Sequence, residues 1–237
     1  MSKEYTEQSY VDMDKSYDKM VENEHVQRLF EYSKPLLLKM NRLMSYYRCA
    51  LMEIETKFNV LNEEFSLRYD RNPISNIKSR LKKPESISEK LKRKGLSQSL
   101  QNIEQFINDV AGVRVVCSFL DDVYMLAEAL LAQDDITLVE MKDYIKNPKP
   151  NGYRSLHLIV TVPIFLAHEK RMMKVEIQLR TIAMDFWATL EHQLRYKKDL
   201  DFTEKMEAEL LMCAEISSEL DSRMDGLRSM LQGNIDK

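Results

Sequence analysis

The stretch from Lys149 to Thr181 constrains the fold of this chain more than any other. It contains an apolar run, Leu156–Val162, a polar break at 168–171, and a run in which apolar and polar side chains alternate. Because successive side chains of a strand point to opposite faces, two strands are predicted. The second places Val175, Ile177 and Leu179 on one face and Glu176, Gln178 and Arg180 on the other. Such a polar strand face is either the solvent-exposed side of an edge strand or the floor of a polar site.

Length and composition exclude several classes of protein. A chain of 237 residues, 44% of them hydrophobic, can form one domain with helical additions. The net charge of −3 creates no strong field toward nucleic acid or membrane. The four histidines lack metal-ligand spacing, which argues against a zinc site. No GxGxxG or GxxxxGK[ST] loop occurs, so a bound nucleotide would not lie in a Rossmann or P-loop cradle.

The cysteines favour a cytoplasmic protein. Cys49, Cys117 and Cys213 lie far apart, with neither a CxxC motif nor a signal peptide, as is typical of reduced cytosolic thiols. No apolar run approaches the roughly 18 to 20 residues that span a bilayer. We therefore expect no membrane association.

The chain divides into four predicted segments. Residues 1–24 are a polar tail, 25–71 form N-terminal helices, 72–196 form the central domain and 197–237 form C-terminal helices, as one helix or a pair. In the second segment, Pro35 is expected to interrupt the helix before a longer one at Leu36–Phe58.

Strands and helices alternate within the central domain. Helices are predicted at 101–108, 121–132 and 181–196, and strands at 109–119 and 136–144 in addition to the two described above. The helix at 181–196 has an apolar side made of Ile182, Phe186, Leu190 and Leu194. This order predicts a mixed α/β domain.

A basic run extends from Lys78 to Lys94. It contains a short helix, predicted to be capped by Ser86 or Ser88 and to end at Gly95. Such clusters usually form solvated surface, but Ile87 and Leu91 would anchor this helix to a core and so direct its cations. Several convergent cations suit a polyphosphate. Single-stranded RNA would suit them too, but the run has no stacking aromatic residue, so RNA binding is left open and is not indicated.

Three residues of the strand predicted at 109–119 suggest a structural or functional role. Asp109 is either a turn residue or a metal ligand. Gly112 would let the backbone pass close to a neighbour or to a ligand. Arg114 lies in an otherwise apolar strand and must meet a group that satisfies it, because an unpaired buried cation is costly.

Four groups of residues, in this order, resemble the synthetase domain of the RelA/SpoT family. They are Arg80-x-Lys82-x3-Ser86-x3-Lys90, Asp109-x2-Gly112-x-Arg114, Gly152-Tyr-x-Ser-x-His157 and Glu176-x-Gln178-x-Arg180-Thr181. The resemblance spans about Asn72–Tyr196. With no hydrolase domain before it and no regulatory domain after it, the chain is expected to be a stand-alone small alarmone synthetase, closer to the RelP than to the RelQ type.

The resemblance implies a fold and a reaction. The fold is an α/β (α+β) fold, a nucleotidyltransferase-like mixed β-sheet flanked by helices, here with N- and C-terminal helical extensions. The reaction moves the β,γ-pyrophosphate of ATP to the 3′-hydroxyl of GDP or GTP, giving ppGpp or pppGpp and AMP in the stringent response. The resemblance also implies Mg²⁺ as the cofactor and a homotetramer as the assembly.

The resemblance also implies a role for each site residue. ATP would be bound by Arg80, Lys82, Ser86, Lys90, Arg93 and Arg114, with Arg80 and Arg114 stacked on adenine. GDP or GTP would be bound by Lys142, Lys149, Asn151, Tyr153, His157 and Gln178, with Tyr153 stacked on guanine. Asp109 would bind Mg²⁺, and Glu176 would activate the 3′-hydroxyl and share the metal. Arg180 has two readings, a phosphate contact or a salt bridge to Glu176.

Two other functions are compatible with parts of the pattern. The basic run alone would suit a catalytically inactive nucleotide- or RNA-binding regulator of the same fold, although such a binder has little need of both Asp109 and Glu176. A nucleotidyltransferase that adds nucleotides to another molecule is the third candidate. That chemistry usually needs paired carboxylates on one strand to hold two metals, whereas these two carboxylates come from separate strands.

Overall fold

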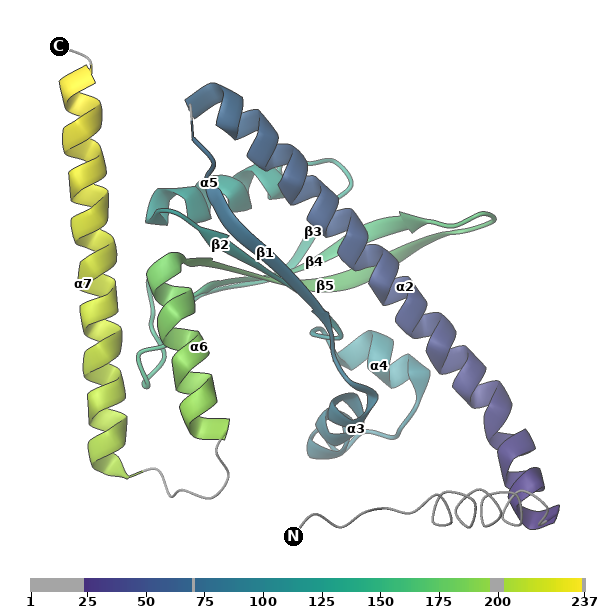
Figure 1. The fold of residues 1–237 in the computed structure, drawn as a ribbon. Coiled ribbons are helices and arrows are strands. Elements are labelled where there is room, and N and C mark those ends of the chain that lie inside the picture. Colours follow the sequence, from purple (N-terminus) through teal and green to yellow (C-terminus); the bar gives the residue numbers. More distant parts are fainter. Residues whose placement is uncertain (1–23, 70, 197–202, 236–237) are drawn as a thin grey trace, which may run out of the picture. The chain divides into compact units, whose positions relative to one another are not determined.

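The computed structural model describes residues 24–69, 71–196 and 203–235, and Figure 1 shows its ribbon. The expected tail at 1–24 lies outside these ranges except for its last residue, where the first described helix begins. The helices are α2 (Glu24–Tyr69), α3 (Pro84–Arg93), α4 (Leu100–Phe106), α5 (Leu120–Leu131), α6 (Ile182–Tyr196) and α7 (Glu204–Ile235). The strands are β1 (Ile74–Leu81), β2 (Ala111–Cys117), β3 (Thr137–Asp143), β4 (Leu156–Phe165) and β5 (Lys170–Thr181). The described residues fall into two compact units, divided between Ser45 and Tyr46, and all five strands belong to the second.

The five strands form one mixed sheet in the order β1-β2-β5-β4-β3, which confirms the predicted fold class. β2 and β5 run parallel, and the other neighbouring pairs run antiparallel. β5 is the central strand. The interpretation of Glu176, Gln178 and Arg180 as the solvent-facing side of an edge strand is therefore wrong, because β2 and β4 pair with β5 on its two sides.

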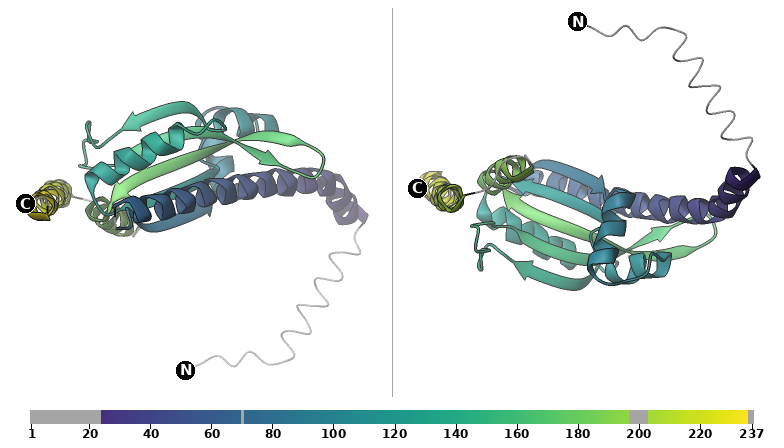
Figure 2. Two further views of the ribbon diagram at one scale, coloured as in Figure 1. Left: turned by 90° about the horizontal axis from the view of Figure 1, so that it is seen from above. Right: turned by 90° about the horizontal axis from the view of Figure 1, so that it is seen from below.

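Alternation decides which face of the sheet is buried under helices. Val175, Ile177 and Leu179 of β5 have no solvent exposure, and Glu176 and Gln178 point to the opposite face. The view from above in Figure 2 shows α5 and the part of α2 from residue 46 onward lying over the sheet. The view from below shows the other face, with α6 near one end and α3 and α4 near the other (Figure 2). The polar face of β5 is therefore the face without the α2 and α5 layer.

α2 differs from its prediction at both ends. It runs from Glu24 to Tyr69 without a break, so the expected interruption at Pro35 is wrong. A proline removes one backbone hydrogen bond and bends a helix, but the good helix formers after it allow the helix to continue. The C-terminal end extends beyond Phe58 because Leu61 and Phe65 continue the buried spacing.

The basic helix α3 begins differently from its prediction. Its N-cap residue is Lys83, which makes no side-chain capping bond, and Pro84 occupies the first turn. Ser86 and Ser88 lie inside the helix, so neither is its cap. A proline suits a first turn because that turn has no internal partner for its N–H group. Gly95 follows the helix with φ +67°, as predicted for its end.

The apolar side predicted for α6 is exposed. Ile182, Phe186, Leu190 and Leu194 are each between 42% and 65% exposed. The helix instead buries Trp187, whose Nε1 donates to the Leu210 carbonyl oxygen of α7 at 2.9 Å. The sequence could not indicate this choice of side because α7 supplies the partner. α7 itself is one helix, not a pair.

Candidate active site

Strand register places one polar side chain from each of the five strands in a single row. Directly paired residues of neighbouring strands present their side chains to the same face. The pairs run from β1 to β3 as Lys78 with Arg114, Arg114 with Gln178, Gln178 with His157, and His157 with Lys142. These five residues form the polar row. It joins residues predicted for the ATP side to residues predicted for the guanosine side.

A second register line places Glu176 opposite Gly112, and Gly112 opposite Arg80. A Cβ atom at Gly112 would lie 3.9 Å from the nearest atoms of Arg80, so no close neighbour requires glycine there. The other predicted reason for glycine, the approach of a ligand, stays a prediction. The absence of a side chain at this position leaves room between the Arg80 guanidinium and the Glu176 carboxylate.

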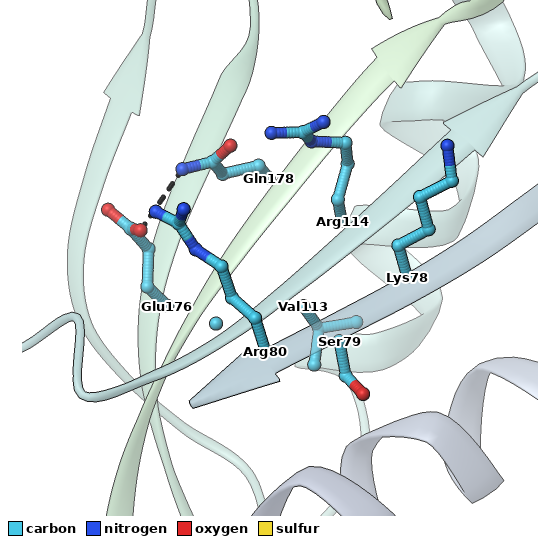
Figure 3. Close-up of a pocket in the computed structure, with 8 residues that line it drawn as sticks. Lys78, Ser79, Arg80, Val113, Arg114, Glu176 and Gln178 are labelled. Atoms are coloured by element: carbon cyan, nitrogen blue, oxygen red, sulfur yellow. Dashed lines mark hydrogen bonds between the residues drawn. The ribbon is translucent and has the colours of Figure 1, made fainter. Parts of the chain in front are cut away.

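A cavity of about 230 Å³ lies over these two lines of residues (Figure 3). It is lined by Lys78, Ser79, Arg80, Gly112, Val113, Arg114, Glu176 and Gln178. Arg80 and Arg114 come from the predicted donor set, and Glu176 and Gln178 come from the predicted acceptor set. Lys78 and Ser79 were not predicted. The two-residue period of β1 places Lys78 on the face of Arg80 and was the signal that could have found it.

Glu176 has two polar neighbours, of which Gln178 is hydrogen-bonded to it. The Gln178 side-chain Nε2 donates to Glu176 Oε2 at 3.0 Å, and Nδ1 of His157 lies 3.8 Å from Glu176 Oε1. The Glu176 side chain is 19% exposed, so one side remains open to a reactant. A carboxylate held in this way can accept a proton from an alcohol that enters the cavity.

The tautomer of His157 follows from the hydrogen bonds of Tyr153. Arg180 Nη2 donates to the Tyr153 hydroxyl oxygen at 2.6 Å, and this oxygen lies 2.8 Å from His157 Nε2. Since the hydroxyl already accepts from Arg180, its own hydrogen is free to point to Nε2. That arrangement leaves the imidazole hydrogen on Nδ1, toward Glu176. Burial, together with the charges of Arg180, Lys149 and Lys142, lowers the pKa of His157 to about 3, so the ring is neutral.

The reading of Arg180 as a salt-bridge partner of Glu176 is wrong. Its ion pair is with Asp185, at 3.2 Å, and its other hydrogen bonds go to Tyr153 and to Gln178 Oε1. Arg180 is only 4% exposed, which explains why it needs a carboxylate partner. Asp185 also lies 3.2 Å from Arg114, and so meets the prediction that Arg114 has a partner.

The loop between β3 and β4 carries three predicted guanosine-side residues. Lys149 Nζ lies 4.7 Å from the centre of the Tyr153 ring and 4.6 Å from that of Tyr144. Asn151 Oδ1 accepts from the Tyr153 backbone N–H at 3.3 Å. Lys142, at the end of the polar row, pairs with Glu140 at 3.0 Å. The structure thus gathers Lys149, Asn151 and Tyr153 within one loop, beside His157.

α7 holds this loop in place. Gly152 has φ +85°, and a Cβ atom there would lie 2.5 Å from that of Ala214 in α7. The Arg154 guanidinium hydrogen-bonds the Ser218 hydroxyl of α7. Tyr153 packs on the cluster of Trp187, Ala188 and Ala214. The position of the Tyr153 ring therefore depends on the C-terminal helix as well as on the sheet.

On the donor side, Asp109 is paired with two lysines. Lys82 Nζ lies 2.8 Å from its Oδ2, and Lys90 Nζ lies 2.8 Å from its Oδ1. Burial opposes ionisation of Asp109, but the hydrogen bonds from Lys82 and Lys90 outweigh it and hold its pKa below the usual value. The structure thus brings these three predicted residues together. Arg93 on α3 is exposed, and Ser86 is half-buried.

Among the described residues, no group of three or more His, Cys, Asp or Glu side chains converges in a way that could hold a metal ion. An all-protein metal cage is therefore absent from that part of the chain. Mg²⁺ commonly needs only one or two carboxylates, with substrate phosphates and water completing its shell. Asp109, whose pKa lies below its usual value, is a carboxylate that meets this smaller requirement.

Comparisons with known proteins point to one family. A family model described as "Region found in RelA / SpoT proteins" matches residues 79–201. The chain is 46% identical over 182 residues to the GTP pyrophosphokinase YwaC of Bacillus subtilis, covering 77% of this chain and 87% of that protein. It is 38% identical over 191 residues to the GTP pyrophosphokinase YjbM of the same organism, covering 81% and 89%. The solved structure of the small alarmone synthetase 1 from Bacillus subtilis, bound to its product pppGpp, matches with a TM-score of 0.75 and 38% identity, covering 82% of this chain and 98% of that one.

The contact between Gly152 and α7 predicts a specific loss of stability. Gly152→Ala introduces strain at positive φ, about 1 kcal/mol, and an overlap with Ala214, about 2 kcal/mol more. We expect the free energy of unfolding, measured by urea denaturation, to fall by about 3 kcal/mol. The overlap is the larger part because the nearest atom belongs to a short side chain on a packed helix.

Two variants separate these contributions. Gly95→Ala, at φ +67° with no heavy atom within 4 Å of the new Cβ, should show only the strain. Gly152→Ala should cost less stability in an Ala214→Gly background than in the wild type, by the part that is due to overlap, because Ala214→Gly alone already carries the cost of a glycine within a helix. Equal losses in Gly95→Ala and Gly152→Ala would show that α7 does not press on the loop.

The neutral state of His157 predicts a dependence of stability on pH. Its pKa in the folded protein is about 3, against 6.5 for an ordinary histidine, so below pH 6.5 the unfolded chain binds the additional proton. Stability from this group is therefore present at pH 7 and is lost as the pH falls. Between pH 7 and pH 5 the loss should be about 2 kcal/mol. His157→Gln should remove this part of the pH dependence of unfolding, and an unchanged slope would contradict the assignment.

Proposed function

The chain belongs to the family of RelA/SpoT proteins, and we propose on this basis that it is an alarmone synthetase. The enzyme transfers the β,γ-pyrophosphate of ATP to the 3′-hydroxyl of GDP or GTP and releases AMP. One observation carries this proposal beyond the resemblance. Arg80 and Arg114 line the same cavity as Glu176 and Gln178, so donor and acceptor residues share one space.

The donor nucleotide binds on the β1 and β2 side of the cavity. Arg80 and Arg114 both line the cavity, and their planar guanidinium groups can stack on adenine. Lys82, Ser86, Lys90 and Arg93 supply donors for the triphosphate. Lys82 and Lys90 already share one carboxylate, so a triphosphate would meet ammonium groups that are close together.

The acceptor nucleotide binds on the β4 side. Tyr153 supplies the stacking plane for guanine, and Lys149 supplies a cation beside it. Lys142 extends the positive charge along the polar row, and Asn151 and Gln178 supply amide groups. His157 completes the wall with a neutral ring, so it can donate a hydrogen bond without repelling the cations around it.

Glu176 acts as the base. It accepts the proton of the 3′-hydroxyl as that oxygen forms a bond to the β-phosphorus of ATP. The bond between the β-phosphorus and the oxygen that bridges it to the α-phosphorus breaks, and this oxygen leaves on AMP. Gln178 and His157 orient the carboxylate toward the alcohol. Positioning of the two nucleotides and neutralisation of their charge supply most of the rate enhancement in transfers of this kind.

We propose Mg²⁺ as the cofactor, held by Asp109 and Glu176 together with phosphate oxygens. When bound, Mg²⁺ neutralises the charge that develops on the transferred group. The support is that Asp109 is held ionised, because a metal ligand must be deprotonated. Lys82 and Lys90, which pair with Asp109, would then be available to the triphosphate.

We propose that the protein assembles as a homotetramer through α6 and α7. The exposed apolar side chains of these helices border a groove of about 730 Å³, lined by Phe119, Ile182, Phe186, Ile216, Leu220 and Met224 among others. Small alarmone synthetases, which this chain resembles, are typically homotetramers. A second copy, with the same exposed apolar rows, is the partner that the groove would accept.

We propose a cytoplasmic location. The support is that Cys49, Cys117 and Cys213 are all free thiols, as is usual in a reducing compartment. As a separate finding, no described helix is both long and apolar enough to cross a bilayer.

Replacement of the base tests the reaction. With ATP, GDP and Mg²⁺, the wild-type protein should form AMP and ppGpp in equal amounts, measured by anion-exchange chromatography. Glu176→Gln should lower kcat by about 10²- to 10⁴-fold, because a general base contributes about this much. The KM for ATP should rise by a smaller factor than kcat falls, because Asp109 remains to hold the Mg²⁺ that contacts the ATP phosphates.

The matched control is Glu104→Gln on α4, which removes a half-buried carboxylate that pairs with Arg171 outside the cavity lining. It should retain the wild-type rate. Full turnover by Glu176→Gln would assign the base elsewhere, and wild-type protein that binds nucleotides without forming AMP would favour an inactive regulator.

Light scattering after size-exclusion chromatography tests the assembly. Four copies of a 28.0 kDa chain give a mass of about 112 kDa. Phe186→Glu and Ile216→Glu place charge in the groove and should shift the mass toward smaller species. Leu67→Glu, an equally drastic change at an exposed position of α2, should not. A wild-type mass of 28 kDa at micromolar concentration would refute the tetramer.

A further inference from the structure

Asp185 connects two arginines from neighbouring strands. It lies in the first turn of α6, and its side chain is 14% exposed. A single carboxylate oxygen, Oδ1, lies 3.2 Å from Nη1 of Arg114 on β2 and 3.2 Å from Nη1 of Arg180 on β5. Arg114 lines the cavity, whereas Arg180 is buried behind it. The Asp185 carboxylate therefore joins Arg114, on the donor side, to Arg180, which so far has no proposed role.

Arg180 carries the connection to the acceptor side. Its Nη2 donates to the Tyr153 hydroxyl at 2.6 Å and to Gln178 Oε1 at 3.1 Å. Gln178 in turn donates to Glu176. A continuous chain of charged and hydrogen-bonded groups thus runs from Arg114, through Asp185 and Arg180, to the base and to the stacking tyrosine.

Asp185 is the counter-charge that the two arginines of this chain share. Arg114 and Arg180 are both cations, and burial together with the charge of Arg180 lowers the pKa of Arg114. Two guanidinium groups in a half-buried site repel each other, and a buried cation without a counter-charge is strongly destabilised. The position of one arginine therefore depends on that of the other, through the oxygen that they share.

We propose that Asp185 and Arg180 are positioning residues that couple the two nucleotide half-sites. Adenine stacked on Arg114 fixes that guanidinium and thereby fixes Asp185 and Arg180. Arg180 then holds the Tyr153 hydroxyl and the Gln178 amide in place for the guanosine nucleotide. By thermodynamic linkage, the guanosine nucleotide strengthens ATP binding by the same factor. This proposal rests on the proposed function, because it takes Arg114 as the ATP contact.

Calorimetric titration of the full chain measures the coupling directly. GDP is titrated into the wild-type protein with Mg²⁺, with and without saturating α,β-methylene ATP, in which the bond that breaks is replaced by a carbon link. The analogue should raise the affinity for GDP by about fivefold or more, and GDP should raise the affinity for the analogue by the same factor. A wild-type protein without this mutual effect overturns the proposal, whatever the variants do.

Asp185→Asn removes the charge and keeps the shape of the side chain. The coupling should fall below about twofold. The factor by which kcat falls should exceed the factor by which the KM of either nucleotide rises, when that KM is measured at a low concentration of the other nucleotide. Arg180→Gln should also abolish the coupling and should weaken GDP binding further, because Tyr153 loses its hydrogen-bond donor. Coupling at the wild-type level in Asp185→Asn would contradict the proposed role.

Asp122→Asn is the matched control. Asp122 forms a hydrogen-bonded ion pair with Arg71, at 2.6 Å, and its side chain is 1% exposed, but it lies outside the cavity lining. The Asp122→Asn variant should have a lower free energy of unfolding and an unchanged coupling between the nucleotides. This result would separate the loss of a buried ion pair from the loss of positioning. Formation of ppGpp by a wild-type protein that shows no coupling would overturn this inference alone. A wild-type protein that forms no ppGpp would overturn the proposed function itself.

Discussion

The register of β5 between β2 and β4 is the constraint on which the candidate site depends. Parallel pairing with β2 sets Glu176 beside Gly112, and antiparallel pairing with β4 sets Gln178 beside His157. Because side chains alternate along a strand, a shift of β5 by one residue would turn Glu176 and Gln178 toward the helical layer. The same shift would expose Val175, Ile177 and Leu179. The burial of these three residues therefore fixes the position of the base.

An excess of positive charge on this face suits a polyphosphate. Among the cavity-lining residues in the described part of the chain, three are cations and one is a carboxylate. The other nearby carboxylates are already engaged, Asp109 by two lysines and Asp185 by two arginines. Such a site is poorly balanced when empty and becomes balanced when phosphates and a divalent cation enter. The charge distribution thus favours the proposed substrates over a neutral ligand.

The local pattern predicted the positions of those candidate site residues that depend on strand alternation and motif spacing. Alternation placed Glu176 and Gln178 on one face, and motif spacing selected Arg80, Arg114 and Tyr153. It failed where the packing of whole elements, or one residue outside the recognised patterns, decides which partner a group meets. The buried side of α6 is chosen by α7, and the partner of Arg180 is a carboxylate on the helix after the strand. The cap of α3 was missed because Pro84 serves its first turn without a capping side chain.

One cavity holds both reactants for the proposed transfer of a pyrophosphoryl group. The most direct test follows isotopic labels from ATP to the products, with ATP labelled in one sample at the α-phosphorus and in another at the γ-phosphorus. The γ-label should appear in ppGpp on the 3′ side of guanosine, and the α-label should appear only in AMP. Label from the α-phosphorus on a larger product with release of pyrophosphate, or γ-label in orthophosphate alone, would contradict the account.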